Sequence, residues 1–241
     1  PLTLSFRFGP AVAVMANAIL LNYKGDMEHF LIGDGPDTRI APLPDDGAPF
    51  TKLHRTFAET FSTALLAAVS GKKTGWIGGI KAYPLESIRD LHFLSMGQDA
   101  RVRDRRLLRD YPTYEDYKAV AEAAEDREML RMVKIVEEYG ASLPRLLDQV
   151  RSLAVPMEEA DITVGTAHRA KGLQWPRVML ADDFEDLQDP KLTGIDRTQA
   201  INLLYVAVTR AEHILDVSPE IQAMAFLDGA DATSGNAAAI A

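Results

Sequence analysis

The chain has 241 residues, with 26 Lys and Arg against 35 Asp and Glu and a formal net charge of −9. This length allows one or two domains with a real hydrophobic core, and the excess of acids indicates weak affinity of this chain alone for a nucleic-acid backbone. No stretch approaches the roughly 20 apolar residues of a membrane helix and no signal sequence is visible. Cysteine is absent, which excludes disulfides. We therefore expect no membrane partner and a cytoplasmic location, or a nuclear one in a eukaryote.

The first predicted elements are an extended segment and a helix. Apolar and polar residues alternate over positions 2–8, which indicates a half-buried strand or extended segment. Pro10 then opens a helix, because proline is favoured in the first turn and apolar residues follow at helical spacing. Arg7 therefore lies on the polar side, just before this helix.

Residues 25–49 are rich in Gly, Pro and Asp and predict an irregular connection. A strand over 50–54 leads to Arg55, and a helix over 57–70 and a strand at 76–77 follow. The glycine pair after this strand predicts a tight turn before the next helix.

Residues 98–153 form a charged, helix-favouring segment without a strand-like run. It contains the densest basic cluster of the chain, formed by Arg101, Arg103, Arg105, Arg106 and Arg109. Interleaved acids favour an ordinary solvated helix, and contact with a duplex backbone is the alternative. The tyrosines that follow are Tyr111, Tyr114 and Tyr117. Their spacing of three fits burial along one helix face as well as a base-stacking platform, and burial is the safer interpretation.

The C-terminal part returns to alternating strands and helices. A strand over 162–165 enters the segment Gly165–Trp175, and a second strand follows over 178–181. An apolar helix then ends in Arg210 and leads to a last strand over 213–217. From about Asp228 the composition is Ala, Gly, Ser and Asn, which predicts a disordered tail.

Two segments of this part carry residues suited to binding phosphates. Gly165–Trp175 combines hydroxyl, imidazole and cationic side chains with a flexible Lys-Gly step, and it follows a strand, where open α/β sheets place ligand sites. Arg210 stands at the end of an apolar helix whose burial fixes the direction of the guanidinium. Arginine stays charged and binds phosphate oxygens with a planar fork.

These segments resemble motifs V and VI of UvrD/Rep-type superfamily 1 DNA helicases, which read T-x-H-x-A-K-G-L-E and L-x-Y-V-A-x-T-R-A. Leu4–Gly9 is similar to motif IV in the form found in F-box DNA helicases. Arg55 and Thr56 resemble motif IVa, although Phe57 replaces its asparagine. The resemblance spans about residues 1–217 and is tightest over 163–211.

The resemblance implies a nucleotide site. Arg7 and Arg210 would be the catalytic arginines that stabilise charge on the γ-phosphate of ATP, and Gly172 would let the backbone approach the nucleotide. Gln174 replaces the family's glutamate, and its amide oxygen would accept a hydrogen bond near the nucleotide sugar. We expect both arginines to point from separate elements into one cleft that is open to solvent, with Gln174 on its rim.

The resemblance also implies a nucleic-acid track. Thr166, His168 and Lys171 would contact the backbone of single-stranded DNA, and Arg55 is a further candidate for this track.

A complete ATP motor also needs a loop of the form G-x-x-x-x-G-K-[ST] and a carboxylate that holds Mg²⁺. The nearest approach to this loop is 70–74, where Leu66 replaces the first glycine and Lys73 the Ser or Thr. Asp182 and Asp183 follow an apolar run but lie between motifs V and VI, so they predict a core strand with a solvated end and no metal site.

We therefore expect the C-terminal half of a longer protein, inactive as an ATPase on its own. ATP and Mg²⁺ would be held mainly by an N-terminal RecA-like domain of the same protein, which would be its partner together with single-stranded DNA.

The predicted fold is α/β, a RecA-like domain with a mainly parallel sheet that carries a small all-helical insertion. Its parts are residues 1–97 and 154–227 for the RecA-like domain, 98–153 for an insertion that resembles a reduced 2B subdomain, and 228–241 for the tail. The implied function is that of an ATP-dependent 3′-to-5′ DNA helicase in repair or recombination. The alternatives are a non-catalytic module that binds DNA or a protein, and the helicase part of a helicase-nuclease.

Overall fold

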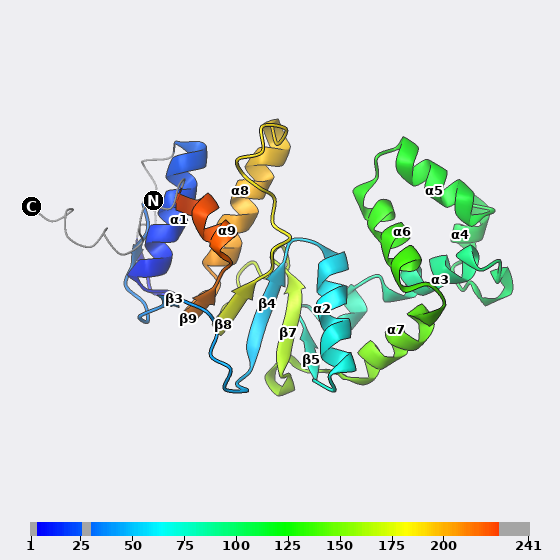
Figure 1. Cartoon of the computed structure of the whole chain (residues 1–241), viewed down its shortest axis with the longest axis horizontal. Coiled ribbons are helices and arrows are strands. Elements are labelled where there is room, and N and C mark those ends of the chain that lie inside the picture. Colours follow the sequence, from blue (N-terminus) through cyan, green and yellow to red (C-terminus); the bar gives the residue numbers. More distant parts are fainter. Residues whose placement is uncertain (1–3, 26–29, 227–241) are drawn as a thin grey trace, which may run out of the picture. The chain divides into compact units, whose positions relative to one another are not determined.

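The computed structural model describes residues 4–25 and 30–226, which form two compact units (Figure 1). One unit comprises the described residues up to Thr56 and from Asp161 onward, and the other is Phe57–Ala160. The predicted tail at 228–241 lies outside the described residues. Within the described part of the chain, no helix is long and apolar enough to cross a membrane.

The first unit contains a parallel sheet, in the strand order β3-β9-β8-β4-β7. Its strands are β3 (Arg39–Ile40), β4 (Phe50–His54), β7 (Ile162–Thr166), β8 (Trp175–Leu180) and β9 (Ala211–Asp216). Strand β4 pairs on both sides, with Phe50 opposite Ile162 and Thr51 opposite Val178. Strands buried on both faces carry continuous apolar runs rather than alternation, which is why β7 is buried over its first four residues. The predicted α/β class with a parallel sheet is confirmed.

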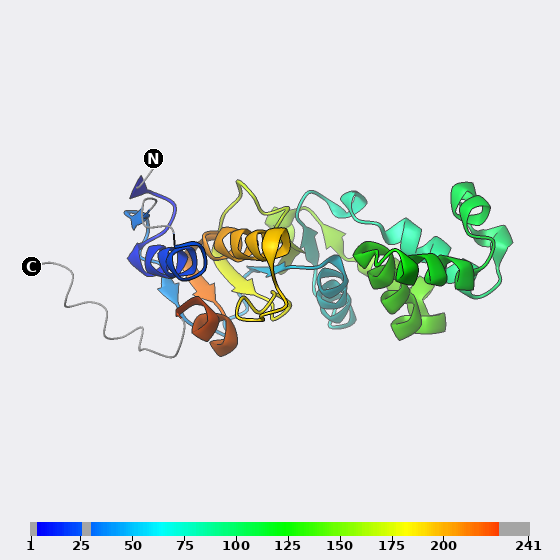
Figure 2. The same ribbon diagram turned by 90° about the horizontal axis from the view of Figure 1, so that it is seen from above.

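Three helices accompany this sheet: α1 (Pro10–Lys24), α8 (Gly194–Val208) and α9 (Pro219–Phe226). Helix α1 lies against both α8 and α9 (Figures 1 and 2). It begins at Pro10 as predicted, and its apolar stripe of Val12, Met15, Ala16 and Ile19 is completely buried. Helix α9 was not predicted, although Ser218, Pro219 and Glu220 form a helix-start signal and the Ser218 hydroxyl accepts the backbone N–H of Ile221 at 3.4 Å.

A separate parallel pair precedes α1, formed by β1 (Leu4–Ser5) and β2 (Ile32–Gly33). The N-terminal strand is therefore shorter than the alternation over 2–8 suggests, and residues 2 and 3 lie outside the described chain. Strands β2 and β3 both fall in the segment that we expected to be irregular. Each has only two residues, which is too short for a periodic pattern.

The second unit is mainly helical. Its helices are α2 (Phe57–Val69), α3 (Leu85–Ser95), α4 (Arg105–Asp110), α5 (Tyr114–Ala123), α6 (Arg127–Tyr139) and α7 (Leu143–Ser152). The parallel strands β5 (Thr74–Trp76) and β6 (Ala154–Val155) complete it. Single 3-10 turns are η1 (Ile80–Ala82), η2 (Asp99–Arg101), η3 (Gly140–Ser142) and η4 (Met157–Glu159). Residues 98–153 contain helices and turns alone, as predicted, but the compact unit also includes α2, β5 and α3.

Candidate nucleotide and nucleic-acid site

The candidate residues of the first unit lie at opposite edges of its sheet. Because the strands are parallel, the residues that precede them share one edge and those that follow them share the other. Gln174 immediately precedes β8 and Arg210 immediately precedes β9. Arg55 follows β4, and His168 lies two residues beyond β7. Residues 167–174 connect the two edges, and this segment carries two predicted DNA contacts, His168 and Lys171, and two predicted nucleotide contacts, Gly172 and Gln174.

The guanidinium of Arg210 is held entirely by neutral oxygen atoms. Its Nε donates to the carbonyl oxygen of Val206 at 2.8 Å, and the two terminal nitrogens donate to the carbonyl oxygen of Leu173 at 3.0 Å and to Thr209 Oγ1 at 2.9 Å. A guanidinium has five N–H donors, so two remain available to a ligand. No carboxylate pairs with Arg210 anywhere in the described residues.

Arg210 is only 7% exposed, so the prediction that it lies in an open cleft is wrong. Helix α8 ends at Val208, and the backbone then turns the side chain back against the last helical turn and the carbonyl of Leu173. Burial lowers the pKa of Arg210, and the nearby charge of Arg7 lowers it further. The two arginines therefore lie within electrostatic reach of each other, and their convergence on one ligand stays a prediction.

Arg7 projects from an unusually tight turn. The carbonyl oxygens of Ser5 and Phe8 accept backbone N–H groups of Asp34 and Gly35 at 2.8 and 3.1 Å. The glycines of this contact have no room for a side chain: a Cβ on Gly33 would lie 2.3 Å from the carbonyl oxygen of Gly9. The Arg7 side chain itself is exposed, with no hydrogen bond or ion pair within the described residues.

Hydrogen bonds connect this turn to strand β9. The Thr38 hydroxyl donates to the carbonyl oxygen of Glu212 at 2.6 Å and accepts the backbone N–H of Gly9 at 3.0 Å. The Gln174 amide nitrogen donates to the Glu212 carboxylate, which leaves its amide oxygen free as an acceptor. Gln174 is therefore exposed on the same edge as Arg210, which fits its predicted place on a rim.

Gly172 has a left-handed backbone conformation within the connecting segment 167–174. Its φ of +84° is a conformation that glycine adopts without strain, and nothing lies within 4 Å of a Cβ placed there. The backbone is therefore open at this point, which is compatible with close approach of a ligand.

The predicted DNA contacts begin at the end of β7 and continue along the connecting segment towards α8. Thr166 is half-buried at the end of β7, and His168 and Lys171 line a pocket of about 290 Å³ against α8. Partial burial lowers the pKa of His168, and the charges of Lys171 and Arg55 lower it further, so the imidazole is neutral at pH 7. Of the two cationic candidates, Lys171 has no ion-pair partner within the described residues, whereas Arg55 is paired with Glu185.

Arg55 is anchored within the protein. Its Nε donates to the carbonyl oxygen of Asp183 at 2.8 Å, and a terminal nitrogen pairs with Glu185 at 2.8 Å. The Asp183 carboxylate accepts the backbone N–H groups of Arg55 and Thr56 at 2.9 and 2.7 Å and the Thr56 hydroxyl at 2.9 Å. This carboxylate therefore accepts three hydrogen bonds from Arg55 and Thr56. Among the described residues, no group of three His, Cys, Asp or Glu could hold a metal ion.

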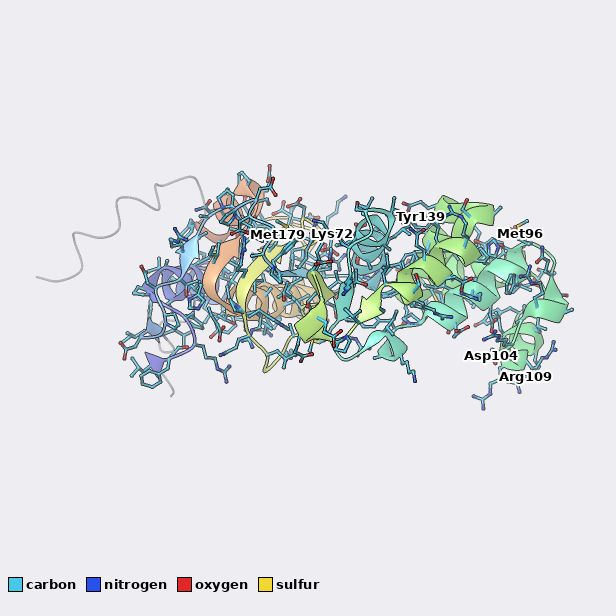
Figure 3. All side chains as sticks on the ribbon, turned by 90° about the horizontal axis from the view of Figure 1, so that it is seen from below. Lys72, Met96, Asp104, Arg109, Tyr139 and Met179 are labelled. Carbon is cyan, nitrogen blue, oxygen red and sulfur yellow. The ribbon has the colours of Figure 1, made fainter. Side chains whose placement is uncertain are left out.

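In the second unit, the arginine cluster has mostly local partners. The Arg101 guanidinium lies 4.0 Å from the centre of the Phe93 ring, and Arg103 pairs with Glu86 at 3.4 Å. Arg109 pairs with Asp110 at 2.8 Å at the far end of α4, where Figure 3 labels Arg109 beside Asp104. These contacts favour a solvated helix over a duplex-binding surface.

The tyrosines favour the structural interpretation too. Tyr117 is 4% exposed and meets Tyr111 edge-on, with ring centres 4.9 Å apart. Tyr114 is half-buried, and burial raises its pKa to about 12. They do not form an open stacking platform.

Sequence reasoning missed four supporting residues: Thr38, Leu173, Asp183 as a hydrogen-bond acceptor, and Glu212. Leu173 acts through its backbone, so its side chain carried no signal. The G-x-G pattern at 33–35 was a usable signal for close backbone contact.

Comparison with known proteins agrees with these motifs. Residues 161–215 match the family described as UvrD-like helicase C-terminal domain. F-box DNA helicase 1 of Gallus gallus is 32% identical over 250 residues, covering 95% of this chain and 24% of the relative. F-box DNA helicase protein 1 of Schizosaccharomyces pombe is 28% identical over 253 residues, covering 94% of this chain and 28% of the relative.

The chain thus spans about a quarter of the length of these curated relatives. The match extends along almost all of the chain, through both compact units. Residues 161–215 thus match a UvrD-like helicase C-terminal domain, and almost the whole chain is similar to part of the F-box DNA helicases.

Proposed function

We propose that this chain is the C-terminal motor domain of an ATP-dependent 3′-to-5′ DNA helicase that acts in DNA repair or recombination, in the cytoplasm or in a nucleus. It supplies the catalytic arginines of the ATP site and part of the track for single-stranded DNA. The observation that carries this proposal is the buried guanidinium of Arg210, which has no acidic partner in the described residues and lies within electrostatic reach of Arg7.

A buried charge without a counter-charge is unfavourable, so natural proteins retain one chiefly where a ligand completes it. Two arginines held near each other add mutual repulsion, which an anion between them would relieve. The free N–H groups of Arg210 and the exposed Arg7 side chain suit the oxygens of a phosphate. The residues at this edge therefore fit a nucleoside triphosphate.

Bound ATP supplies the phosphoryl group that is transferred to water. Arg210, held rigidly by three oxygen atoms, and Arg7, free to reach from its turn, neutralise charge on the phosphate oxygens. Such an arginine contributes about 10³–10⁵ in rate. Gln174 offers its amide oxygen to the nucleotide sugar, and Gly172 leaves the backbone open to it. Mg²⁺ and the remaining phosphate contacts would belong to the N-terminal RecA-like domain.

The carboxyl edge and the segment that follows β7 bind the DNA strand. Lys171 provides positive charge for the phosphates, whereas Arg55 is already paired with Glu185. Thr166 and the neutral His168 provide hydrogen-bond donors to phosphate oxygens. Residues 167–174 join this edge to Arg210, because the carbonyl of Leu173 accepts from its guanidinium. A change of grip on the strand can therefore move the arginine that acts on ATP.

The test is DNA-stimulated ATP hydrolysis and strand unwinding by the full-length protein that contains this chain. Arg210→Lys and Arg7→Ala should each reduce the hydrolysis rate by about 10³-fold or more, with a much smaller change in nucleotide affinity. Arg177→Ala is the matched control, because Arg177 pairs with Asp46 at 2.8 Å elsewhere on the same unit.

Normal hydrolysis by both arginine variants would reject the motor proposal. DNA binding by a wild-type protein that does not hydrolyse ATP would favour the non-catalytic module instead.

A further inference from the structure

The pocket of about 290 Å³ beside motif V extends well beyond the residues proposed to contact the DNA backbone. His168 and Lys171 form one wall, and α8 provides the rest through Gln199, Asn202, Leu203, Tyr205 and Val206. We infer that this pocket receives one nucleobase of the single strand, splayed out of the stack beside the phosphate that Lys171 binds. This inference rests on the proposed function and adds a base-binding site to the strand track.

The pocket combines an apolar floor with amide groups at its edge. Leu203 is buried, and Tyr205 and Val206 are half-buried, so together they offer a partly desolvated surface with one aromatic ring. Every nucleobase has a flat apolar face that stacks on such a surface. The volume is near the lower end of small-ligand pockets, which is about 300 Å³, and therefore suits a single base.

The amides are placed to meet the edge of a base. Gln199 and Asn202 are three residues apart on α8, so they share its exposed face. The Asn202 amide oxygen accepts from Lys24 Nζ, which directs its two N–H donors away from Lys24 and leaves them free for acceptors on a base. The Gln199 amide has no hydrogen bond within the described residues, so it can donate or accept.

The wall formed by His168 and Lys171 suits a base that is attached to a phosphate. Lys171 is exposed, and no hydrogen bond or ion pair of its side chain is found in the described chain. His168 is uncharged at neutral pH and can donate a hydrogen bond. A DNA strand provides both the base and the phosphate next to it, and it already passes this wall in the proposed track. A free nucleotide has the same chemistry, so the experiment must separate the two sources.

The first experiment locates the base. The full-length protein is irradiated with an oligothymidylate that carries 4-thiothymidine, and in parallel with 8-azido-ATP, and the labelled peptides are mapped by mass spectrometry. We expect the DNA label, and not the ATP label, in residues 199–206. A DNA label confined to other segments, or an ATP label in 199–206, would overturn the inference.

The second experiment separates base binding from backbone binding. Gln199→Ala and Asn202→Ala should each lower affinity for a normal strand about 3–10-fold, and leave affinity for an abasic strand of equal length unchanged. The dependence of affinity on salt should not change, because no phosphate contact is lost, whereas Lys171→Ala should flatten it. Alanine favours the helix, so folding is not at risk.

Thr198→Ala, on α8 but outside the pocket, and Lys24→Ala, which removes only the partner of Asn202, are the matched controls. Both should retain the preference for the normal strand over the abasic one. If the wild-type protein binds no single strand, the proposed function and the inference both fail. If it binds normally and the Gln199 and Asn202 variants keep their full preference for the normal strand, the pocket inference alone fails.

Discussion

Arg210 donates a hydrogen bond to the carbonyl oxygen of Leu173 at 3.0 Å, and its own carbonyl oxygen accepts the backbone N–H of Trp175 at the same distance. These two bonds clamp the end of motif V to the end of motif VI. The clamp uses the backbone of motif V, so it does not depend on which side chains stand at 173 and 175. These two hydrogen bonds could transmit a movement of the proposed DNA-binding segment to the arginine of the proposed nucleotide site.

Gly172→Ala should weaken the coupling between the segment 167–174 and Arg210. An alanine at a φ of +84° is strained by about 1–2 kcal/mol, although no atom obstructs its Cβ. We expect the segment 167–174 to relax away from Arg210, so DNA stimulation of ATP hydrolysis should fall more than DNA affinity. Gly71→Ala, with a φ of +71° and equally open space, is the control for general strain. Stimulation that stays normal in Gly172→Ala would exclude a coupling role for this turn.

Gly33→Ala should displace Arg7 without touching it. The new Cβ would lie 2.3 Å from the carbonyl oxygen of Gly9, so one of the two backbones must shift. We expect ATP hydrolysis by the full-length protein to fall towards the level of Arg7→Ala, while single-strand affinity stays near wild type. Gly47→Ala controls for backbone strain without a clash, because its φ is +70° and nothing lies within 4 Å of its Cβ. A crystal structure of the variant with the Arg7 turn unmoved would contradict this expectation.

Asp183→Ala should reduce stability, whereas Asp182→Ala should not. Asp183 satisfies two backbone N–H groups and a hydroxyl, and leaving such partly buried donors unpaired costs about 1–3 kcal/mol each. Asp182 is exposed, so its removal should have little effect. Urea unfolding of this chain measures the free energy of unfolding of both variants. A melting temperature that rises with Mg²⁺ in the wild type and not in Asp183→Ala would show a metal site instead.

Acid should destabilise the chain through His54. Its side chain is buried, both ring nitrogens lack a hydrogen bond, and burial lowers its pKa from 6.5 to about 4. The unfolded chain binds a proton on this histidine between about pH 6.5 and 4 and the folded chain does not, so the free energy of unfolding falls as the pH is lowered through this window.

His54→Leu should therefore make the loss of stability between pH 7 and pH 5 smaller than in the wild type, as measured by urea unfolding at several pH values. His213→Asn is the control, because His213 is exposed. Equal acid sensitivity of His54→Leu and the wild type would show that His54 is protonated in the folded chain.

The chain by itself should have no DNA-stimulated ATPase activity. It contains no sequence of the phosphate-loop form, and the Asp183 carboxylate is committed to backbone groups. Phosphate release by rigorously purified protein is the measurement. Turnover that is abolished by a substitution within this chain would reveal a nucleotide site that we have overlooked.

Much of the architecture could be predicted from local patterns. The strand at 50–54 and the start of α1 at Pro10 follow from periodicity and from the position of proline, and both are confirmed. The two-residue strands β2 and β3 could not be predicted, because hydrogen bonds to distant segments define them.

The candidate residues could be named from the sequence, but their surroundings could not. Motif recognition identified Arg210 and its proximity to Arg7, yet it could not indicate that Arg210 is buried. Its guanidinium donates to the carbonyl of Leu173, which is 37 residues away in sequence and is brought close by the pairing of β8 with β9. The anchoring of Arg55 by Asp183 and Glu185 depends on tertiary contact in the same way.

The turn that carries Arg7 packs its backbone directly against the backbone of a second segment of the chain. Gly9, Gly33 and Gly35 lie at this contact, so no side chain separates the two segments. Rotation of side chains, which takes picoseconds to nanoseconds, therefore cannot disturb the backbone contacts of this turn. The Arg7 side chain beyond it is exposed and can change rotamer within nanoseconds. The backbone of this turn is fixed, while the guanidinium of Arg7 reorients quickly. Arg7 can therefore bind an anion before any larger part of the molecule moves, without waiting for domain closure.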